Sequence, residues 1–444
     1  MRGTNIAAVH AETSWQAPQI EAALLTRVAT ARPFVMLSKD DTNLPVAQKQ
    51  VGCVFLVHAI ESWDALRGVY LAMIKDERFL PIVISINRHF PGDLGYGHEE
   101  ITSRELDNLG IPHGRLGMSD QDTAYAILKE LAPDVIFRQS QWEIDVPPAF
   151  RTEQLDFARI CVVPYGMSIT AKFSKGEILT KQASDKHYNQ IYHQRAWRVF
   201  CETELTRSLF LEHHQTDTHK FILSGYPKLF QLLKSRDDID KWPIKRSSRN
   251  YRVIWAPHHS ITPDWLGFGV FHHIYKDFLS WASATPSIDF VLKPHPALFA
   301  SLISKGMVSE PALNEFLSNW KNLPNCRIEE AGYDSLFASS DMMVTDGISF
   351  LVEYPIFEKP LVFFDSGQHS PLNPIGQLAK EASHTVVSFA EMQHAVFSYM
   401  HAAPWAFEIP RRNLLKQLFP DTREPVAIIM EEIVKSLAKE KRRE

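Results

Sequence analysis

One stretch of the chain has the pattern of a complete strand–turn–helix–strand unit. Residues 342–344 form a short apolar run, which is typical of a strand buried on both faces. Residues 345–347 (Thr-Asp-Gly) end that run, Ser349 can begin a helix, and residues 361–364 form the next apolar run. Such a unit places backbone N–H groups and a hydroxyl at the carboxyl end of a parallel strand, where open α/β sheets bind anions. An ordinary turn without a ligand fits this stretch equally well.

The same alternation runs along most of the chain. Apolar runs of strand length are separated by segments with the 3.6-residue period of amphipathic helices. The pattern predicts strands at residues 51–57, 80–86, 134–139, 159–164, 198–201, 220–224, 251–256, 288–293, 327–329, 342–344, 361–364 and 384–389. It predicts helices at residues 63–76, 123–131, 185–197, 204–213, 270–282, 311–320, 390–401 and 425–439. Strands that alternate with helices imply parallel sheets with right-handed crossovers.

With 444 residues the chain is too long for one ordinary domain. Residues 234–250 are dense in charge and contain one proline, the composition of a linker. We therefore predict a partly helical extension at 1–50, a first domain at 51–233, a hinge-like linker at 234–250 and a second domain with a tail helix at 251–444. Two doubly wound, Rossmann-like domains would face each other across a cleft. That arrangement suits an acceptor on the first domain and a nucleotide-linked donor on the second.

Composition narrows the classes of function. The formal net charge is −5, so no global basic field points to nucleic acid. Cys53, Cys161, Cys201 and Cys326 are widely spread without metal-binding spacing, which favours a reduced, cytoplasmic protein. We find no signal-peptide pattern and no apolar run of membrane-spanning length. The basic end of the tail helix leaves a peripheral contact with the inner face of the membrane open.

Polar residues stand where the predicted strands end, which is where α/β proteins build their sites. In the second domain these residues are His258, His259, Lys293, His295, Thr345, Asp346, Gly347 and Ser349. Imidazoles and hydroxyls can donate hydrogen bonds to phosphate oxygens. A single histidine is more often a surface or capping residue, and it is the recurrence at strand ends that favours a function. His295 lies between two prolines that restrict its backbone.

The first domain has its own strand-end set, namely His58, Arg138, Gln139, Tyr165 and Gly166. His58 could be a general base for an acceptor hydroxyl, because an imidazole titrates near neutral pH. A hydrogen bond that merely orders the loop is an equally good interpretation. The chain has no dinucleotide fingerprint, Walker loop or Gly-x-Ser-x-Gly elbow, which disfavours hydride transfer, ATP hydrolysis and esterase chemistry.

In this order, the motifs resemble the CDP-glycerol glycerophosphotransferase family, the teichoic acid primases and polymerases with a GT-B fold. Residues 225–228 (Gly-Tyr-Pro-Lys) match the family's Gly-Tyr-Pro-Arg, and residues 256–258 (Ala-Pro-His) match its Ala-Pro-Thr. His295-Pro296 matches its His-Pro element. Residues 345–360 match its Thr-Asp-Tyr-Ser-Ser hallmark with the later acidic residue (Glu353) and Lys-Pro. The resemblance spans roughly residues 51 to 400.

Two departures set this chain apart. The family's His-Gly, which resembles the site of its catalytic base, aligns with Tyr165-Gly166, and a tyrosine does not have the pKa of a histidine. The hallmark's Tyr-Ser pair is Gly347-Ile348, which leaves one of its two hydroxyls. We therefore expect a divergent branch that acts in the assembly of capsule, lipopolysaccharide or another surface glycan.

The resemblance implies a transferase that moves a glycerol-phosphate or related polyol-phosphate from a CDP-linked donor to a hydroxyl of a glycan or lipid-linked acceptor. Two alternatives stay open: a GT-B glycosyltransferase that uses a UDP- or CMP-sugar, and a non-catalytic nucleotide-binding component of a glycan assembly complex. No cofactor is firmly implied, with a divalent cation left open, and no residue is assigned as a metal ligand. Oligomeric state is not specified by the sequence. The implied roles are catalysis for His58, His295 and Tyr165, donor binding for His258, His259, Lys293, Thr345, Asp346, Gly347, Ser349 and Glu353, and acceptor binding for Arg138, Gln139 and Gly166.

Overall fold

The computed structural model describes residues 50–89, 93–172, 176, 187–214, 217–330, 332–419 and 423–442. The predicted N-terminal extension, apart from residue 50, lies outside the described residues, as does the start of the helix predicted at 185–197.

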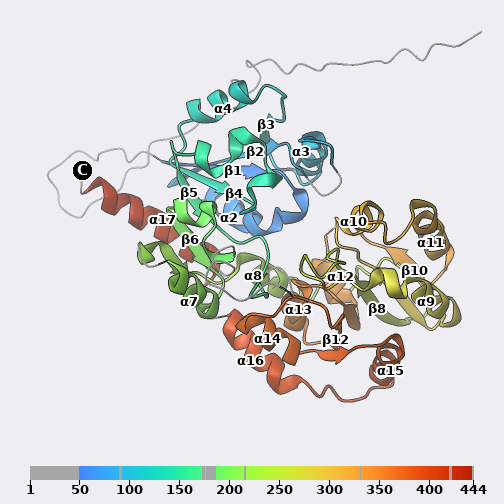
Figure 1. Cartoon of the computed structure of the whole chain (residues 1–444). Coiled ribbons are helices and arrows are strands. Elements are labelled where there is room, and N and C mark those ends of the chain that lie inside the picture. Colours follow the sequence, from blue (N-terminus) through green and yellow to red (C-terminus); the bar gives the residue numbers. More distant parts are fainter. Residues whose placement is uncertain are drawn as a thin grey trace, which may run out of the picture.

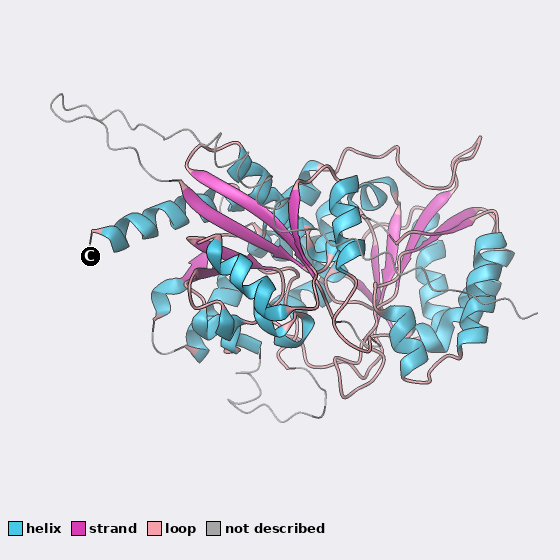
Figure 2. Cartoon of the chain, turned by 90° about the horizontal axis from the view of Figure 1, so that it is seen from above, coloured by secondary structure: helices cyan, strands magenta, loops and turns pink. Residues whose placement is uncertain are grey.

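The strands form two separate parallel sheets, one in each predicted domain (Figures 1 and 2). The first sheet has seven strands in the order β3-β2-β1-β4-β5-β6-β7, and the second has six in the order β10-β9-β8-β11-β12-β13. The first sheet comprises β1 (Val51–Val57), β2 (Phe79–Ile86), β3 (His113–Leu116), β4 (Val135–Arg138), β5 (Arg159–Val162), β6 (Arg198–Cys201) and β7 (Phe221–Leu223). The second comprises β8 (Tyr251–Ala256), β9 (Ile288–Leu292), β10 (Cys326–Ile328), β11 (Met342–Thr345), β12 (Leu361–Phe364) and β13 (His384–Val386).

Helices cover both faces of each sheet. In the first domain they are α2 (Asp64–Ile74), α3 (Glu99–Asn108), α4 (Gln121–Glu130), α6 (Ile191–Arg195), α7 (Glu204–His213) and α8 (Pro227–Lys234). After the linker come α9 (Phe271–Ala284), α10 (Leu298–Ser304), α11 (Glu310–Asn322), α12 (Asp334–Ser339), α13 (Phe350–Glu353), α14 (Pro374–Glu381), α15 (Phe389–Met400), α16 (Glu408–Leu418) and α17 (Pro425–Lys441). None of the described helices is long and apolar enough to cross a membrane.

The central strands are buried on both faces because their side chains alternate between two cores. In β1, Cys53, Phe55 and Val57 belong to one hydrophobic cluster, and Val54 and Leu56 belong to another on the opposite face. This packing explains the continuous apolar run in the sequence. It also explains why β1 was predicted with its observed bounds.

The segment predicted as a hinge-like linker is anchored on the second domain. The side chains of Trp242 and Ile244 are 1% and 5% exposed and lie in a large core cluster. The backbone N–H of Lys241 donates to Ser339 Oγ at 3.1 Å. The described linker is therefore a packed strap, which differs from the hinge inferred from its charged composition.

The tail helix α17 returns to the first domain, although the sequence grouped it with the second (Figure 1). Ile429 and Ile433 are fully buried in the cluster that covers one face of the first sheet. Such burial contributes about 1.5–3 kcal/mol for each side chain. Trp197 Nε1 donates to Glu440 at 2.6 Å, and Arg198 pairs with Glu432 at 3.1 Å. The chain therefore passes between the domains twice.

The two domains share one hydrophobic core. The cluster that contains Trp242 joins Ala65, Met167 and Ile169 of the first domain to the α12–α16 side of the second. Beside it, the segment after β5 pairs with the second domain through an antiparallel bridge between Thr170 and Leu372. These contacts fix how the carboxyl ends of the two sheets face each other.

A substitution at Gly376 can test this interdomain contact. A methyl group added there would lie 2.1 Å from the carbonyl oxygen of Ile169, a backbone atom that cannot swing away. We expect Gly376→Ala to destabilise the protein by about 1–3 kcal/mol through overpacking. This loss opposes the gain of about 1 kcal/mol that alanine brings to a helix. Urea unfolding followed by circular dichroism measures the change.

Gly95→Ala is the matched control, because its new methyl group would meet nothing within 4 Å. It should change stability by less than about 0.5 kcal/mol. Equal unfolding midpoints for the two variants would contradict the close approach of Ile169 and Gly376.

Candidate functional site

The strand order reverses at one point in each sheet, and the predicted site residues lie there. In the first sheet the reversal falls between β1 and β4, which are followed by His58 and Gln139. In the second it falls between β8 and β11, which are followed by His258 and Asp346. Open α/β sheets bind ligands in the crevice outside such reversal points. The candidate site therefore has two parts, one at the strand-end edge of each sheet, and these two edges approach each other.

Gln139 ties the two strand ends of the first sheet together. Its Oε1 accepts from the backbone N–H groups of His58 at 2.8 Å and Ala59 at 3.0 Å, and its Nε2 donates to the Ala59 carbonyl at 2.8 Å. The His58 side chain is buried, and among the described residues its Nδ1 has no hydrogen-bond partner. Burial, with smaller contributions from the positive charges of Arg138 and Arg88, lowers the pKa of His58 to about 3. The ring is therefore neutral at neutral pH.

Arg138 is fully buried and holds the loop that follows β4. Its guanidinium pairs with Glu143 at 2.6 Å, donates to the carbonyls of Ser140 and Phe150, and lies 4.4 Å from the ring centroid of Tyr192. These contacts serve the architecture of the loop. The acceptor-binding role of Arg138 and Gln139 stays a prediction.

Tyr165 and Gly166 lie where the domains meet. The Tyr165 hydroxyl accepts from Trp142 Nε1 at 3.2 Å, and burial raises the pKa of this tyrosine. A methyl group added at Gly166 would lie 3.3 Å from Ser349 Oγ of the second domain. Trp142 in turn makes an edge contact with Trp265 of the second domain, with ring centroids 5.9 Å apart. Neither tryptophan was predicted from the sequence, where their only signal is a position in the loops that follow β4 and β8.

Three histidines form a cluster at the strand-end edge of the second sheet. The ring centroids of His258 lie 4.5 Å from His259 and 4.9 Å from His295. His259 stacks on His295 at 4.1 Å with an interplanar angle of 18°. Burial is the main cause that lowers the pKa of all three rings, to about 4 for His259. The structure thus brings together three of the histidines that the sequence placed at separate strand ends.

Backbone hydrogen bonds assign the tautomers of two of these rings. The N–H of Ser260 donates to His258 Nδ1 at 3.2 Å, and the Ser260 hydroxyl, which lies 2.8 Å from the same nitrogen, can donate to it as well. The N–H of Ala297 donates to His295 Nδ1 at 3.1 Å. A backbone N–H can only donate, so each Nδ1 is an acceptor and the proton of the neutral ring is on Nε2. His258 and His295 can therefore offer Nε2–H donors to a ligand.

A divalent cation fits this geometry less well than an anion does. The three rings have ring nitrogens within 4.8 Å of one another, and histidine is a common ligand of zinc. However, metal binding needs the lone pair of the nitrogen that carries the proton here. Two nearly parallel rings 4.1 Å apart also cannot both direct a lone pair at one ion unless one ring rotates. With these tautomers, the cluster presents hydrogen-bond donors rather than metal ligands.

Lys293 adds positive charge next to the cluster. Its side chain is buried, and its Nζ donates to the Glu330 carbonyl at 3.0 Å. Burial lowers its pKa to about 8, so the ammonium form still prevails at neutral pH. Lys293 and the imidazole donors are suited to the charge of a phosphate group.

Thr345 and Asp346 brace the site. Thr345 Oγ1 donates to the Ala256 carbonyl at 2.7 Å and accepts from the Gly347 N–H at 3.0 Å. The two carboxylate oxygens of Asp346 accept from the backbone N–H groups of His258 at 2.6 Å and Val270 at 2.7 Å. Burial raises the pKa of Asp346 to about 7, and these N–H bonds oppose that rise. Both polar side chains are engaged with the backbone, and their donor-binding role stays a prediction.

Gly347 and Ser349 follow this brace. A methyl group at Gly347 would lie 3.0 Å from the Cβ of His258, which explains the absence of a side chain. Ser349 is half-buried and its side chain makes no capping hydrogen bond to the helix that it precedes. That helix, α13, spans only four residues before a 3-10 turn, so the helix dipole expected from the sequence is small. The hydroxyl of Ser349 is the group that remains for a ligand.

Glu353 is fully buried and links the domains. Its carboxylate accepts from the Tyr333 hydroxyl at 2.5 Å and lies 3.8 Å from Nζ of Lys228, which belongs to the first domain. Burial raises the pKa of Glu353, and the charge of Lys228 opposes that rise. This pair connects the Gly-Tyr-Pro-Lys motif to the hallmark motif, a contact that the sequence alone did not show.

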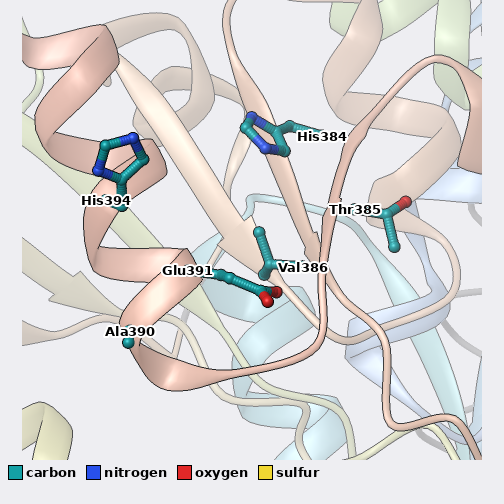
Figure 3. Close-up of a pocket in the computed structure, with 6 residues that line it drawn as sticks. All are labelled: His384, Thr385, Val386, Ala390, Glu391 and His394. Atoms are coloured by element: carbon teal, nitrogen blue, oxygen red, sulfur yellow. The ribbon is translucent and has the colours of Figure 1, made fainter.

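A pocket of about 400 Å³ lies elsewhere, beside the edge strand β13 (Figure 3). It is lined by His384, Thr385, Val386, Ala390, Glu391 and His394. None of the predicted site residues lines it, and it is separated from β11 by strand β12. This pocket is therefore a region outside the candidate site.

No family model matches the sequence. No curated protein matches it significantly. Solved structures do match. The UDP-GlcNAc 2-epimerase from Neisseria meningitidis bound to UDP-GlcNAc is 14% identical, over 87% of this chain and 100% of that chain, with a TM-score of 0.53. MnaA of S. aureus with UDP is 11% identical over 88% and 97%, with a TM-score of 0.56.

A variant of the wall teichoic acid polymerase TagF soaked with CDPG is 14% identical over 88% of this chain and 89% of that chain, with a TM-score of 0.52. This chain has the GT-B fold. The predicted fold class is thereby confirmed, with two all-parallel α/β domains as in these neighbours. Identities this low establish the fold alone.

Mutation can separate the role of Asp346, which braces the backbone, from that of Ser349, whose hydroxyl is open to a ligand. Asp346→Ala removes the acceptor of two buried backbone N–H groups, each of which costs about 1–3 kcal/mol when unsatisfied. We expect the unfolding free energy in urea to fall by at least about 2 kcal/mol. Ser349→Ala should change it by less than about 0.5 kcal/mol, because its hydroxyl caps nothing. A stable Asp346→Ala variant would show that the brace is not needed.

Proposed function

We propose that this protein is a transferase that moves a glycerol-phosphate or related polyol-phosphate group from a CDP-activated donor to a hydroxyl of a surface-glycan or lipid-linked acceptor. The observation that carries the proposal is the histidine cluster at the reversal point of the second sheet. Two of its rings are fixed as Nε2–H donors, beside the ammonium of Lys293 and ahead of the hydroxyl of Ser349. Such a set is suited to the diphosphate of a nucleotide-linked donor.

The choice of a CDP-linked polyol rests on the resemblance of the motifs and is supported by one structural neighbour. The TagF variant soaked with CDPG shares the fold over 88% of this chain. If the acceptor is lipid-linked, the enzyme works in the cytoplasm at the inner face of the membrane. That location is part of the proposal.

In the proposed reaction, an acceptor hydroxyl approaches from the first domain and attacks the β-phosphorus of the donor. The new bond forms between the acceptor oxygen and the β-phosphorus, the bond from that phosphorus to the bridging oxygen breaks, and CMP leaves with the bonding electrons. His258, His295 and Lys293 stabilise the charge that develops on the leaving phosphate. Positioning and electrostatic stabilisation supply most of the rate in phosphoryl transfer.

The proton of the acceptor hydroxyl must reach a base or water. His58 is the proposed recipient at the first strand-end edge, although a pKa of about 3 makes it a weak base. Tyr165, which aligns with the family's histidine, has a raised pKa and is protonated at neutral pH.

A second candidate function is transfer of a sugar from a UDP- or CMP-linked donor. Two neighbours with the same fold favour it, because one is bound to UDP-GlcNAc and the other to UDP. The strand-end donors described above would serve the diphosphate of a UDP-sugar as well as that of a CDP-linked polyol, and the single phosphate of a CMP-sugar with fewer contacts. The two candidates differ in the bond that breaks, which is a P–O bond in polyol-phosphate transfer and the C–O bond of the sugar in glycosyl transfer.

A thermal-shift panel distinguishes the donors. We expect CDP-glycerol or CDP-ribitol to raise the melting temperature, because a ligand that binds only the folded state stabilises it by about 2.7 kcal/mol at 100 times its Kd. CDP should give a smaller rise, and UDP and UDP-GlcNAc should give none. Release of CMP from CDP-glycerol in the presence of glycan or lipid-linked acceptors would then establish turnover.

A shift with UDP-GlcNAc and release of UDP would favour the sugar transferase instead. Binding of a nucleotide without turnover over the acceptor panel would favour the non-catalytic alternative. If no nucleotide shifts the melting temperature, the donor site is assigned wrongly.

Substitution of the diphosphate-binding residues tests the site itself. We expect His295→Ala and Ser349→Ala each to weaken CDP-glycerol binding about tenfold or more, since a hydrogen bond to a charged group contributes about 1.5–3 kcal/mol. His384→Ala, in the pocket beside β13, is the control and should leave the affinity unchanged. Isothermal titration calorimetry measures the Kd values. Wild-type affinity in both site variants would refute the assignment.

A further inference from the structure

The histidine cluster contains one ring whose protonation the fold does not fix. His258 and His295 each have an Nδ1 that accepts a backbone N–H. The Nδ1 of His259 is enclosed and has no hydrogen-bond partner among the described residues. A partly buried ring with an unpartnered nitrogen, stacked on a second imidazole at 4.1 Å, needs an explanation.

We infer that His259 takes up a proton when a diphosphate group binds beside it, and that the resulting imidazolium holds the phosphate charge in the site. This inference rests on the proposed donor site. It goes beyond that site by assigning a distinct role to one member of the cluster. His259 would gain one positive charge when the ligand binds, and this charge would offset part of the negative charge of the diphosphate.

His259 is neutral at neutral pH, because burial and, to a smaller extent, the charge of Lys305 lower its pKa to about 4. The rings of His258 and His295 pack against it, and Lys305 lies at the end of α10. Lys293 precedes His295 by two residues at the end of β9, and Asp346 after β11 binds the backbone N–H of His258. The carboxylate of Asp346 is engaged by two backbone N–H groups, which leaves it little scope to compensate a proton on the ring.

A bound diphosphate reverses this balance. One opposite charge within about 4–6 Å raises the pKa of an imidazole by about 1–3. A diphosphate linked to a nucleotide brings two charges, so the pKa of His259 can rise from about 4 past neutrality. The proton that moves comes from the solvent, and no covalent bond changes.

The other two rings are poorly placed to accept that proton. Protonation of His295 would put an N–H on Nδ1, opposite the backbone N–H of Ala297. Protonation of His258 would put one opposite the N–H of Ser260 and would reverse the 2.8 Å hydrogen bond with Ser260 Oγ, which already accepts from the N–H of Phe268. Two donors would then face each other at about 3 Å. His259 has no such conflict, which is why the geometry selects it.

Calorimetry in two buffers tests the inference. CDP and inorganic pyrophosphate are titrated into the EDTA-treated protein at pH 7, once in PIPES and once in Tris, whose ionisation enthalpies differ. We expect the difference in binding enthalpy to correspond to uptake of about 0.5–1 proton for each ligand bound, as a pKa that crosses neutrality requires. In His259→Gln the uptake should fall to near zero while binding persists at lower affinity.

His384→Gln, in the pocket beside β13, is the control and should take up protons as the wild type does. The affinity of the wild type for pyrophosphate should fall up to tenfold for each pH unit between the pKa of His259 in the free protein and its pKa in the complex, and should level off above the latter; that of His259→Gln should fall much less. The decline has this sign because the proton is bound more tightly in the complex than in the free protein.

Four outcomes are separable. Binding without proton uptake in the wild type overturns the inference and leaves the donor site intact. Unchanged uptake in His259→Gln places the proton on another group and also overturns it. Failure of both ligands to bind overturns the donor site together with the inference. Uptake of zinc with release of protons would identify a cation site and overturn both.

If His259→Gln does not fold, as judged by circular dichroism, the wild type still provides the answer. In protein labelled with ¹⁵N-histidine, pyrophosphate should move one ring to the imidazolium chemical shifts at pH 7. A spectrum in which all rings near the site stay neutral after binding would refute the inference.

Discussion

The carboxylate of Asp346 is the contact on which the candidate site depends. It joins the end of β11 to the backbone at the end of β8 and at the start of α9 through two hydrogen bonds of 2.6 and 2.7 Å. Because one of them fixes the backbone of His258, it also fixes where the histidine cluster begins. Gln139 has the corresponding position in the first sheet, where it accepts from the backbone of His58 and Ala59. In each domain, one side chain therefore links the two strand ends at the reversal point by accepting hydrogen bonds from backbone N–H groups.

The interdomain core determines how these two edges face each other. Because the segment after β5 packs into the second domain and α17 returns to the first, a rotation of one domain would disrupt both contacts. The buried pair of Lys228 and Glu353 adds a polar contact, whose separation would leave an uncompensated charge in a buried place. The described structure therefore favours an arrangement in which Gly166 stays close to Ser349.

Much of the fold could be predicted from the sequence, and the failures have physical causes. Strands buried on both faces, such as β1, are continuous apolar runs and were found with their bounds. The edge strand β3 (His-Gly-Arg-Leu) was missed, because only Leu116 is buried and the pattern is polar. Pro355 ends the α-helical part of the hallmark unit after Glu353, since proline lacks the N–H that the helix needs. The amphipathic pattern of α17 showed that one face of the helix is buried. Such a pattern does not indicate which domain covers that face.

The candidate site was less accessible to sequence reasoning than the fold. The strand-end rule placed the right histidines at one edge, because parallel strands end on the same side of a sheet. It could not show that Thr345 and Asp346 are engaged with the backbone. A residue that braces a loop and a residue that binds a ligand can be of the same type and stand at the same position after a strand. The tautomers of His258 and His295 depend on backbone N–H groups two residues further on, and their direction follows only from the folded loops. Residue type alone therefore could not separate the groups that brace the loops from those that are open to a ligand.

Two differences from the family that the motifs resemble, His258 in place of a threonine and Gly347 in place of a tyrosine, can be understood as one change. Where the family has threonine after Ala-Pro, this chain has His258, whose Cβ lies 3.0 Å from the position that a side chain at residue 347 would occupy. A tyrosine cannot stand at residue 347 beside that histidine without displacing it, whereas glycine can. The chain thus lacks the phenolic hydroxyl of the hallmark and has an imidazole N–H at the same edge of the sheet. The replacement keeps a hydrogen-bond donor at this edge, although burial lowers the pKa of His258 well below its ordinary value and the ring is neutral at neutral pH.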